Sequence, residues 1–297
     1  MTVPREPWAD HDRPVAVAVD GSAYARAAAD WAAGEALRRE VALRVLTVVE
    51  VGTGDSPFGP VVPAATGWDE RVEDALDVLS DTETRLRETY PELKLERDVL
   101  VGDPVRILET AAHEAAVLVV GSRGRGGFAG LALGSVSLHL AANARCPLVI
   151  VPQGRAAATH PGPTVVGVST HECLEVLQFG LEHAAHTEGG LRIVHVWNPY
   201  PAHSATYISD SDITARKAAE RLADWLKAAG AEQFGLRPEI SVLRGHPAQV
   251  LTEQSRGADL IVVGSHRRWL PLSGAVGPTL HELLANARCP VAVVPVH

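Results

Sequence analysis

Residues 117–152 read VLVVGSRGRGGFAGLALGSVSLHLAANARCPLVIVP, and residues 260–295 read LIVVGSHRRWLPLSGAVGPTLHELLANARCPVAVVP. The two stretches align without a gap at an offset of 143 and are identical at 16 of 36 positions. Each half also begins with a β-rich run that follows a proline, at 15–19 and at 164–168. Self-similarity at a fixed spacing predicts two copies of one domain of about 150 residues.

The repeat divides the 297-residue chain into a first domain at 1–152 and a second at 163–297. Between them, 153–162 reads QGRAAATHPG, whose small, polar and turn-forming residues predict a linker. A content of 46% hydrophobic and 21% charged residues is typical of globular domains rather than disordered chains.

Apolar runs alternate with helical patterns along the first copy. We expect strands at 15–19, 43–51, 94–101, 117–120 and 148–151, and helices at 23–40, 68–90, 104–114 and 131–143. Asp103 precedes Pro104 and is expected to cap the helix that follows. Because the strands are continuous apolar runs, this order predicts an α/β fold of two tandem doubly wound domains. Each domain is expected to have a mainly parallel five-stranded sheet.

Composition argues against several classes of function. A net charge of −9 disfavours a general nucleic-acid surface, which is usually basic. No apolar run reaches about 18 residues, so we expect no membrane span. The segment 1–12 lacks the apolar core of a signal peptide, which favours a cytoplasmic location.

The cysteines and histidines show no metal-binding pattern. The three cysteines, Cys146, Cys173 and Cys289, lack CxxC spacing, so neither a disulfide framework nor a zinc site is expected. Cys146 and Cys289 occupy equivalent positions and are expected to be buried structural thiols. His183 and His186 have a spacing that could hold a metal, but we expect them on a solvated surface.

A glycine-rich loop with the pattern G-x2-G-x9-G-S follows the strand at 117–120. Gly121 and Gly124 are expected to let the main chain approach a ligand, because neither has a Cβ. Gly134 and Ser135 open the next helix, whose unpaired N–H groups and dipole suit a phosphate. The Ser135 hydroxyl can donate one further hydrogen bond.

Two cations, Arg123 and Arg125, stand on the same loop and could add charge to the site. The pattern lacks the lysine of G-x4-G-K-[ST], so it does not predict a P-loop NTPase, and it is not a G-x-G-x-x-G dinucleotide motif. The alternative is a glycine-rich surface loop with Ser135 as a helix cap. The place of the glycine-rich loop at the carboxyl ends of a parallel sheet favours ligand binding over this alternative.

Asp20 comes at the end of the first strand, and its carboxylate is expected to face the same rim. A carboxylate there can accept hydrogen bonds from ribose hydroxyls or help to hold a metal ion beside phosphates. Its alternative role is to cap the following helix, with Gly21 and Ser22 as the turn. In combination with the glycine-rich loop, the ligand role is favoured.

This combination resembles the ATP-binding branch of the universal stress protein family, twice over and along nearly the whole chain. The resemblance implies a Rossmann-like, adenine nucleotide α-hydrolase-like fold and ATP as ligand, with or without Mg²⁺. It implies that Asp20 contacts the nucleotide and that Ala18 and Val48 line the adenine pocket. The residues implied for the phosphates and ribose are Gly121, Gly124, Gly134, Ser135 and Val136. It also implies that the domains pair within one chain through their last strands, 148–151 and 291–294, and that two chains form a homodimer.

The second copy departs from this pattern, although Gly264 and Gly277 keep two of the glycines. The changes are Arg267 in place of Gly124, Pro278 in place of Ser135 and Ser169 in place of Asp20. Proline removes both the hydroxyl and an N–H group, so we expect a degenerate domain with reduced or lost ATP binding. The alternative is a different anion site formed by His266, Arg267 and Arg268.

Three functions therefore stand open: an ATP-binding stress-response regulator, a slow ATPase or phosphotransferase, and an interaction module that binds no nucleotide. Phosphoryl transfer needs positioned charge and a group that orients the nucleophile. The sequence supplies Asp20, Arg123 and Arg125 but no recognisable base. We expect a regulator rather than an enzyme, with at most slow hydrolysis.

Overall fold

The computed structural model describes residues 12–50, 68–124, 133–143, 145–153, 162–169, 174–197, 211–266 and 276–296. The chain forms two compact units, Met1–Gly154 and Arg155–His297. Most of the predicted linker at 153–162 lies outside the described residues.

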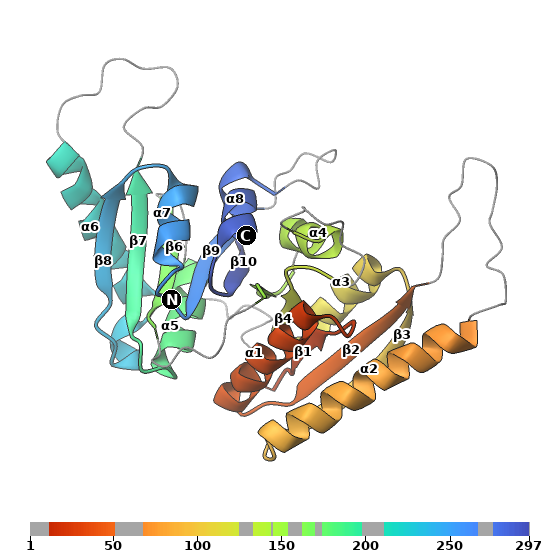
Figure 1. Ribbon diagram of the computed structural model, residues 1–297. Coiled ribbons are helices and arrows are strands. Elements are labelled where there is room, and N and C mark those ends of the chain that lie inside the picture. The colour runs from red at the N-terminus through yellow and green to blue at the C-terminus, as the bar shows by residue number, and fades with distance from the viewer. Residues whose placement is uncertain are drawn as a thin grey trace, which may run out of the picture. The chain divides into compact units, whose positions relative to one another are not determined.

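The first unit has one parallel sheet with the strand order β3-β2-β1-β4-β5 (Figure 1). Helices α1 and α2 pack on one face of the sheet, and α3 and α4 pack on the other. Its strands are β1 (Val15–Ala18), β2 (Leu43–Glu50), β3 (Leu95–Gly102), β4 (Val117–Gly121) and β5 (Leu148–Val151). Its helices are α1 (Ala23–Arg39), α2 (Trp68–Thr89), α3 (Pro104–Glu114) and α4 (Ser135–Asn143).

The second unit repeats this arrangement with the parallel order β10-β9-β6-β7-β8. Its strands are β6 (Thr164–Val168), β7 (Leu191–Trp197), β8 (Glu239–Arg244), β9 (Leu260–His266) and β10 (Val291–Val296). Its helices are α5 (Leu174–Ala185), α6 (Ser211–Ala228), α7 (Pro247–Gln254) and α8 (Pro278–Asn286), with a short 3₁₀ helix, η2 (Ala231–Phe234), before β8. The predicted α/β fold of two tandem doubly wound domains is confirmed.

Alanines bring α1 close to the sheet of the first unit. The strand residues Val15, Val17, Val117 and Val119 are fully buried in the centre of that sheet. The helix covers them with small side chains, since Ala25, Ala28, Ala29, Ala32, Ala33 and Ala36 are all buried. Small residues on the inner face allow the helix axis to approach the strands closely. Because of this close approach, α1 also packs against the last residue of β4.

Helix α3 begins as predicted, because the Asp103 side chain accepts a hydrogen bond from the N–H of Arg106 at 2.9 Å. The equivalent residue before α7, His246, makes no side-chain capping bond. Both helices are preceded by a glycine at positive φ, 149° at Gly102 and 155° at Gly245. Glycine adopts such angles at little cost, which explains why both copies have it at this position.

One predicted helix is shorter than expected. The sequence predicts a helix at 131–143, but α4 begins at Ser135. The Gly134 carbonyl accepts the first intrahelical hydrogen bond, from Leu138, at 3.0 Å. The Gly134 N–H donates instead to the carbonyl of Ser122 at 2.8 Å. This bond to the loop after β4 holds Gly134 outside the helix.

The cysteine prediction is confirmed for Cys146 and Cys289, which are buried and do not form disulfides. Burial raises the pKa of the Cys146 thiol to about 12, so the reactive thiolate is absent near neutral pH. Cys173 lies outside the described residues. Among the residues that the structure describes, no group of three metal-ligating side chains comes together, and no helix is long and apolar enough to span a membrane.

The surface prediction is wrong for His183. This histidine is only 4% exposed, and its Nδ1 lies 2.9 Å from the hydroxyl of Thr164, which is fully buried. His186 is exposed and its Nδ1 contacts the carbonyl of Glu182. The two histidines therefore have different surroundings, because α5 turns position 183 towards the sheet.

Candidate functional site

The predicted site residues of the first unit gather at the carboxyl ends of β1, β2 and β4. Ala18 ends β1 and pairs with Leu46 on β2, so Val48 lies on the same face of the sheet. Both Ala18 and Val48 are half-buried. Gly121 ends β4, which runs parallel to β1. Open α/β sheets bind ligands at this rim.

Asp20 is fixed at this rim by the turn that leads into α1. Its Oδ1 accepts a hydrogen bond from the N–H of Ser22 at 3.0 Å. The cap of α1 is Ser22, whose hydroxyl accepts a hydrogen bond from the N–H of Ala25 at 3.1 Å. The capping role that the sequence left open for Asp20 therefore belongs to Ser22.

The other carboxylate oxygen of Asp20 lies against Gly124. A Cβ added to Gly124 would be 2.7 Å from Oδ2 of Asp20, which is closer than a real Cβ approaches an oxygen. Glycine at this position therefore lets the loop after β4 and the carboxylate after β1 occupy the same rim. The structure thus brings together the glycine-rich loop and Asp20, which the sequence could only associate.

The structure shows a packing reason for Gly121 that the sequence did not reveal. A Cβ at this position would be 2.8 Å from both the carbonyl carbon and the Cβ of Tyr24, and 3.0 Å from its carbonyl oxygen. Tyr24 is in the first turn of α1. Gly121 thus allows α1 to pack directly on the end of β4, and its approach to a ligand stays a prediction.

Two hydrogen bonds close the glycine-rich loop. The N–H of Gly134 donates to the carbonyl of Ser122, and the hydroxyl of Ser137 donates to the carbonyl of Gly121, each at 2.8 Å. Ser122 and Ser137 are both buried. The ends of the loop are therefore fixed to each other, while 125–132, including Arg125, lies outside the described residues.

The N-terminus of α4 points its donors at this rim. Because the Gly134 carbonyl receives the N–H of Leu138, the N–H groups of Ser135, Val136 and Ser137 have no acceptor inside the helix. Ser135 is exposed. Together with the positive end of the helix dipole, these donors favour an anion.

The loop cation Arg123 is held by an aromatic ring. Its guanidinium carbon lies 5.8 Å from the centroid of the Tyr24 ring, within the range of a cation–π contact. Sequence reasoning missed Tyr24, Ser122 and Ser137. The available signal was position: Tyr24 is in the first helical turn after Asp20, and the two serines flank the motif glycines.

Comparison with known proteins matches both halves of the chain to one family. The model of the universal stress protein family matches residues 13–152 and 163–295. The chain belongs to the universal stress protein family. Its two matches confirm the tandem arrangement that the internal repeat predicted.

Similar proteins match nearly the full length of this universal stress protein. One from Mycobacterium tuberculosis H37Rv is 30% identical over 293 residues, covering 94% of this chain and 96% of the relative. Another, from Mycolicibacterium smegmatis, is 29% identical over 291 residues with the same coverage. The crystal structure of a universal stress protein from Archaeoglobus fulgidus has a TM-score of 0.71 at 20% identity, covering 96% of this chain and 97% of that one.

The second unit of this universal stress protein lacks parts of the rim. The carbonyl of Gly277 accepts the first hydrogen bond of α8, from His281 at 2.9 Å, just as Gly134 does for α4. The first residue of α8 is Pro278, which has no N–H to offer. Ser169, with its shorter side chain, follows β6 as Asp20 follows β1. The proposed anion site at 266–268 involves side chains outside the described residues.

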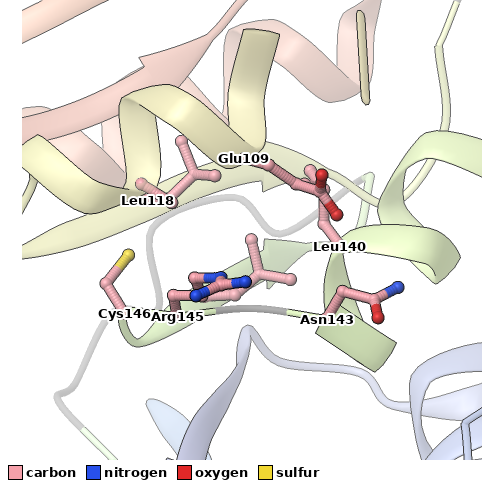
Figure 2. A pocket seen from close by; sticks show the side chains of 8 residues that line it. Glu109, Leu118, Leu140, Asn143, Arg145 and Cys146 are labelled. Atoms are coloured by element: carbon pink, nitrogen blue, oxygen red, sulfur yellow. The ribbon is translucent and has the colours of Figure 1, made fainter. Parts of the chain in front are cut away.

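A small cavity lies at the other end of the strands from the rim, between α3, α4 and the starts of β4 and β5 (Figure 2). Its volume is about 10 Å³, close to the space of one water molecule. Ala112 is in its lining. At the equivalent position of the second unit, the hydroxyl of Ser255 donates to the carbonyl of Thr252 at 2.6 Å and accepts from the N–H of Arg288 at 2.9 Å. The second unit thus places a hydroxyl where the first has a cavity.

We expect Ala112→Ser to raise the stability of the first unit by about 1 kcal/mol, because the hydroxyl enters the cavity and makes the bonds seen in the other copy. Hydrogen exchange of α3 and α4, read by mass spectrometry, measures this effect within one unit. The matched variant Ser255→Ala should lower the stability of the second unit by about 1–3 kcal/mol, since it leaves buried groups without a partner. Faster exchange in Ala112→Ser would contradict the expectation.

Proposed function

We propose that the first domain binds an adenine nucleotide, above all ATP, and that the protein is a nucleotide-dependent stress-response regulator. The observation that carries the proposal is the contact of the Asp20 carboxylate with Gly124 at the sheet rim. A carboxylate in this place suits ribose hydroxyls, and the N–H groups that begin α4 suit phosphates. The half-buried surface of Ala18 and Val48 offers an apolar face to the base.

A bound Mg²⁺ would fit the same rim. Proteins usually hold Mg²⁺ through one or two carboxylates together with the phosphates of the nucleotide, and Asp20 is a carboxylate in reach of that position. The ion would neutralise part of the phosphate charge. The chain's own contribution would be to orient the phosphates and to hold Oδ1 of Asp20 through Ser22.

The rim supports binding better than turnover. Rapid phosphoryl transfer needs charge at the transferred group and a base or positioned water. The described rim contributes Asp20, Arg123 and backbone donors, and the carboxylate is already engaged with the turn before α1. Hydrolysis is therefore expected to be slow, and the protein is proposed to act through its bound state.

The remaining parts of the proposal concern assembly and place of action. We propose that the two domains pair through the last strands of each copy, because an uncovered strand edge invites aggregation. Because of the resemblance to the family, we also propose that two chains form a homodimer and that the protein acts in the cytoplasm. Sedimentation equilibrium of the full chain tests the homodimer, and the mass of a single chain at all concentrations would contradict it.

Titration of the full chain with ATP in a calorimeter, followed by a steady-state phosphate-release assay, tests the proposed function. We expect about one site per chain and slow release. Asp20→Ala should weaken binding by roughly ten- to a hundredfold, since a charge-assisted hydrogen bond is lost. Rapid release that Asp20→Ala abolishes would show an enzyme, and no heat of binding at all would favour an interaction module.

A further inference from the structure

The ring of Tyr24 and the guanidinium of Arg123 join the first turn of α1 to the glycine-rich loop. Tyr24 contacts the loop twice, because its main chain packs on Gly121 and its ring carries the cation at 5.8 Å. The neighbouring main chain is close to α4, since a Cβ on Gly134 would be 3.5 Å from the Cα of Arg123. Arg123 therefore stands between the starts of two helices.

The charge of Arg123 is available to an anion. Among the described residues, no carboxylate forms an ion pair with its guanidinium, whereas Glu35 pairs with both Arg38 and Arg39. An arginine that lies on a ring face loses less conformational freedom when it binds a ligand than one that is free in solvent. The guanidinium can also bind two phosphate oxygens at once.

We propose that Tyr24 is a positioning residue that holds Arg123 as the counter-charge for the phosphate chain of the nucleotide, so that the site selects by phosphate number. This inference rests on the proposed function. A cation held at the rim interacts more strongly with the triphosphate of ATP than with the single phosphate of AMP, because the triphosphate carries more negative charge. Adenosine, which has no phosphate, gains nothing from it.

The test compares ATP, AMP and adenosine affinities of the full chain by calorimetry. Tyr24→Leu removes the ring but keeps the main chain and the Cβ that pack on Gly121. We expect Tyr24→Leu to lower the ratio of ATP affinity to AMP affinity roughly tenfold, as Arg123→Gln does. Adenosine affinity should not change. Tyr24→Phe is the matched control, because it keeps the ring face and should keep the ratio.

The double variant gives the sharper readout. If the ring acts through Arg123, Tyr24→Leu combined with Arg123→Gln should lose no more than Arg123→Gln alone. Independent losses that add together would overturn the inference, as would an unchanged ratio in Tyr24→Leu while wild type binds ATP. If Tyr24→Leu does not fold, Tyr24→Phe and Arg123→Gln decide. A changed ratio of ATP affinity to AMP affinity in Tyr24→Phe would overturn the inference. An unchanged ratio in Tyr24→Phe, together with a reduced ratio in Arg123→Gln, would support it. Absence of ATP binding in wild type would instead remove the proposed function itself.

Discussion

Replacing Gly121 with alanine is expected to lower the free energy of unfolding of the first domain by about 3 kcal/mol. The added methyl group would be 2.8 Å from the carbonyl carbon of Tyr24, and main chain cannot turn away as a side-chain end can. Helix α1 would have to move off β4, and the alanine face that it buries would lose part of its contact with the strands.

Two control variants separate this effect from a general cost of alanine. Among the described residues, a Cβ on Gly134 would have neighbours no closer than 3.5 Å, so Gly134→Ala should cost about 1 kcal/mol, mainly through its place at the helix cap. At Gly264, the equivalent of Gly121, the Cβ would be 2.9 Å and 3.1 Å from side-chain methyl groups of Val296 and Val176 rather than against main chain, so we expect a smaller loss there. Urea unfolding with hydrogen exchange measures all three. Equal losses would refute the packing role of Gly121.

Replacing Gly124 with alanine is expected to lower ATP affinity by roughly ten- to a hundredfold while the domain stays folded. Among the described residues, the added methyl group would come too close only to Oδ2 of Asp20, the end of a short side chain that can rotate by giving up the hydrogen bond from Ser22. Rotation relieves the clash but removes the carboxylate from the place where the nucleotide needs it. We therefore expect the two glycines of one motif to differ, with Gly121 supporting the fold and Gly124 supporting ligand binding.

Gly124→Arg extends this variant, because it copies the residue that the second domain has at this position. We expect no detectable ATP binding in Gly124→Arg and an unfolding transition close to that of wild type. Calorimetry and urea unfolding on the same preparations give both quantities. An arginine variant that binds ATP as tightly as wild type would contradict the role assigned to the Asp20–Gly124 contact.

The fold was largely predictable because its signals are local or repeated. The repeat fixes the domain number, and short apolar runs separated by helical patterns fix the parallel sheets. Helix α4 was predicted too long, since the pattern at 131–134 does not reveal that Gly134 bonds to Ser122. Burial of His183 was missed because it depends on its contact with Thr164 across the helix–sheet interface.

The sequence could predict which described residues meet at the rim, but only some of the contacts that they make there. An Asp-Gly-Ser sequence offers two side chains that can cap a helix, and the geometry alone assigns that role to Ser22 and leaves Asp20 at the rim. The contact between Gly121 and Tyr24 joins residues far apart in the chain. Spacing cannot distinguish a glycine needed for helix packing from one needed for a ligand.

The crystal structure of the full chain grown with ATP and Mg²⁺ would test the central claim most directly. We predict phosphate density against the N–H groups of Ser135, Val136 and Ser137, with Asp20 at the ribose or the ion and the base beside Ala18. Nucleotide bound elsewhere, or a rim left without it at millimolar ATP, would contradict the account and leave only the tandem fold standing.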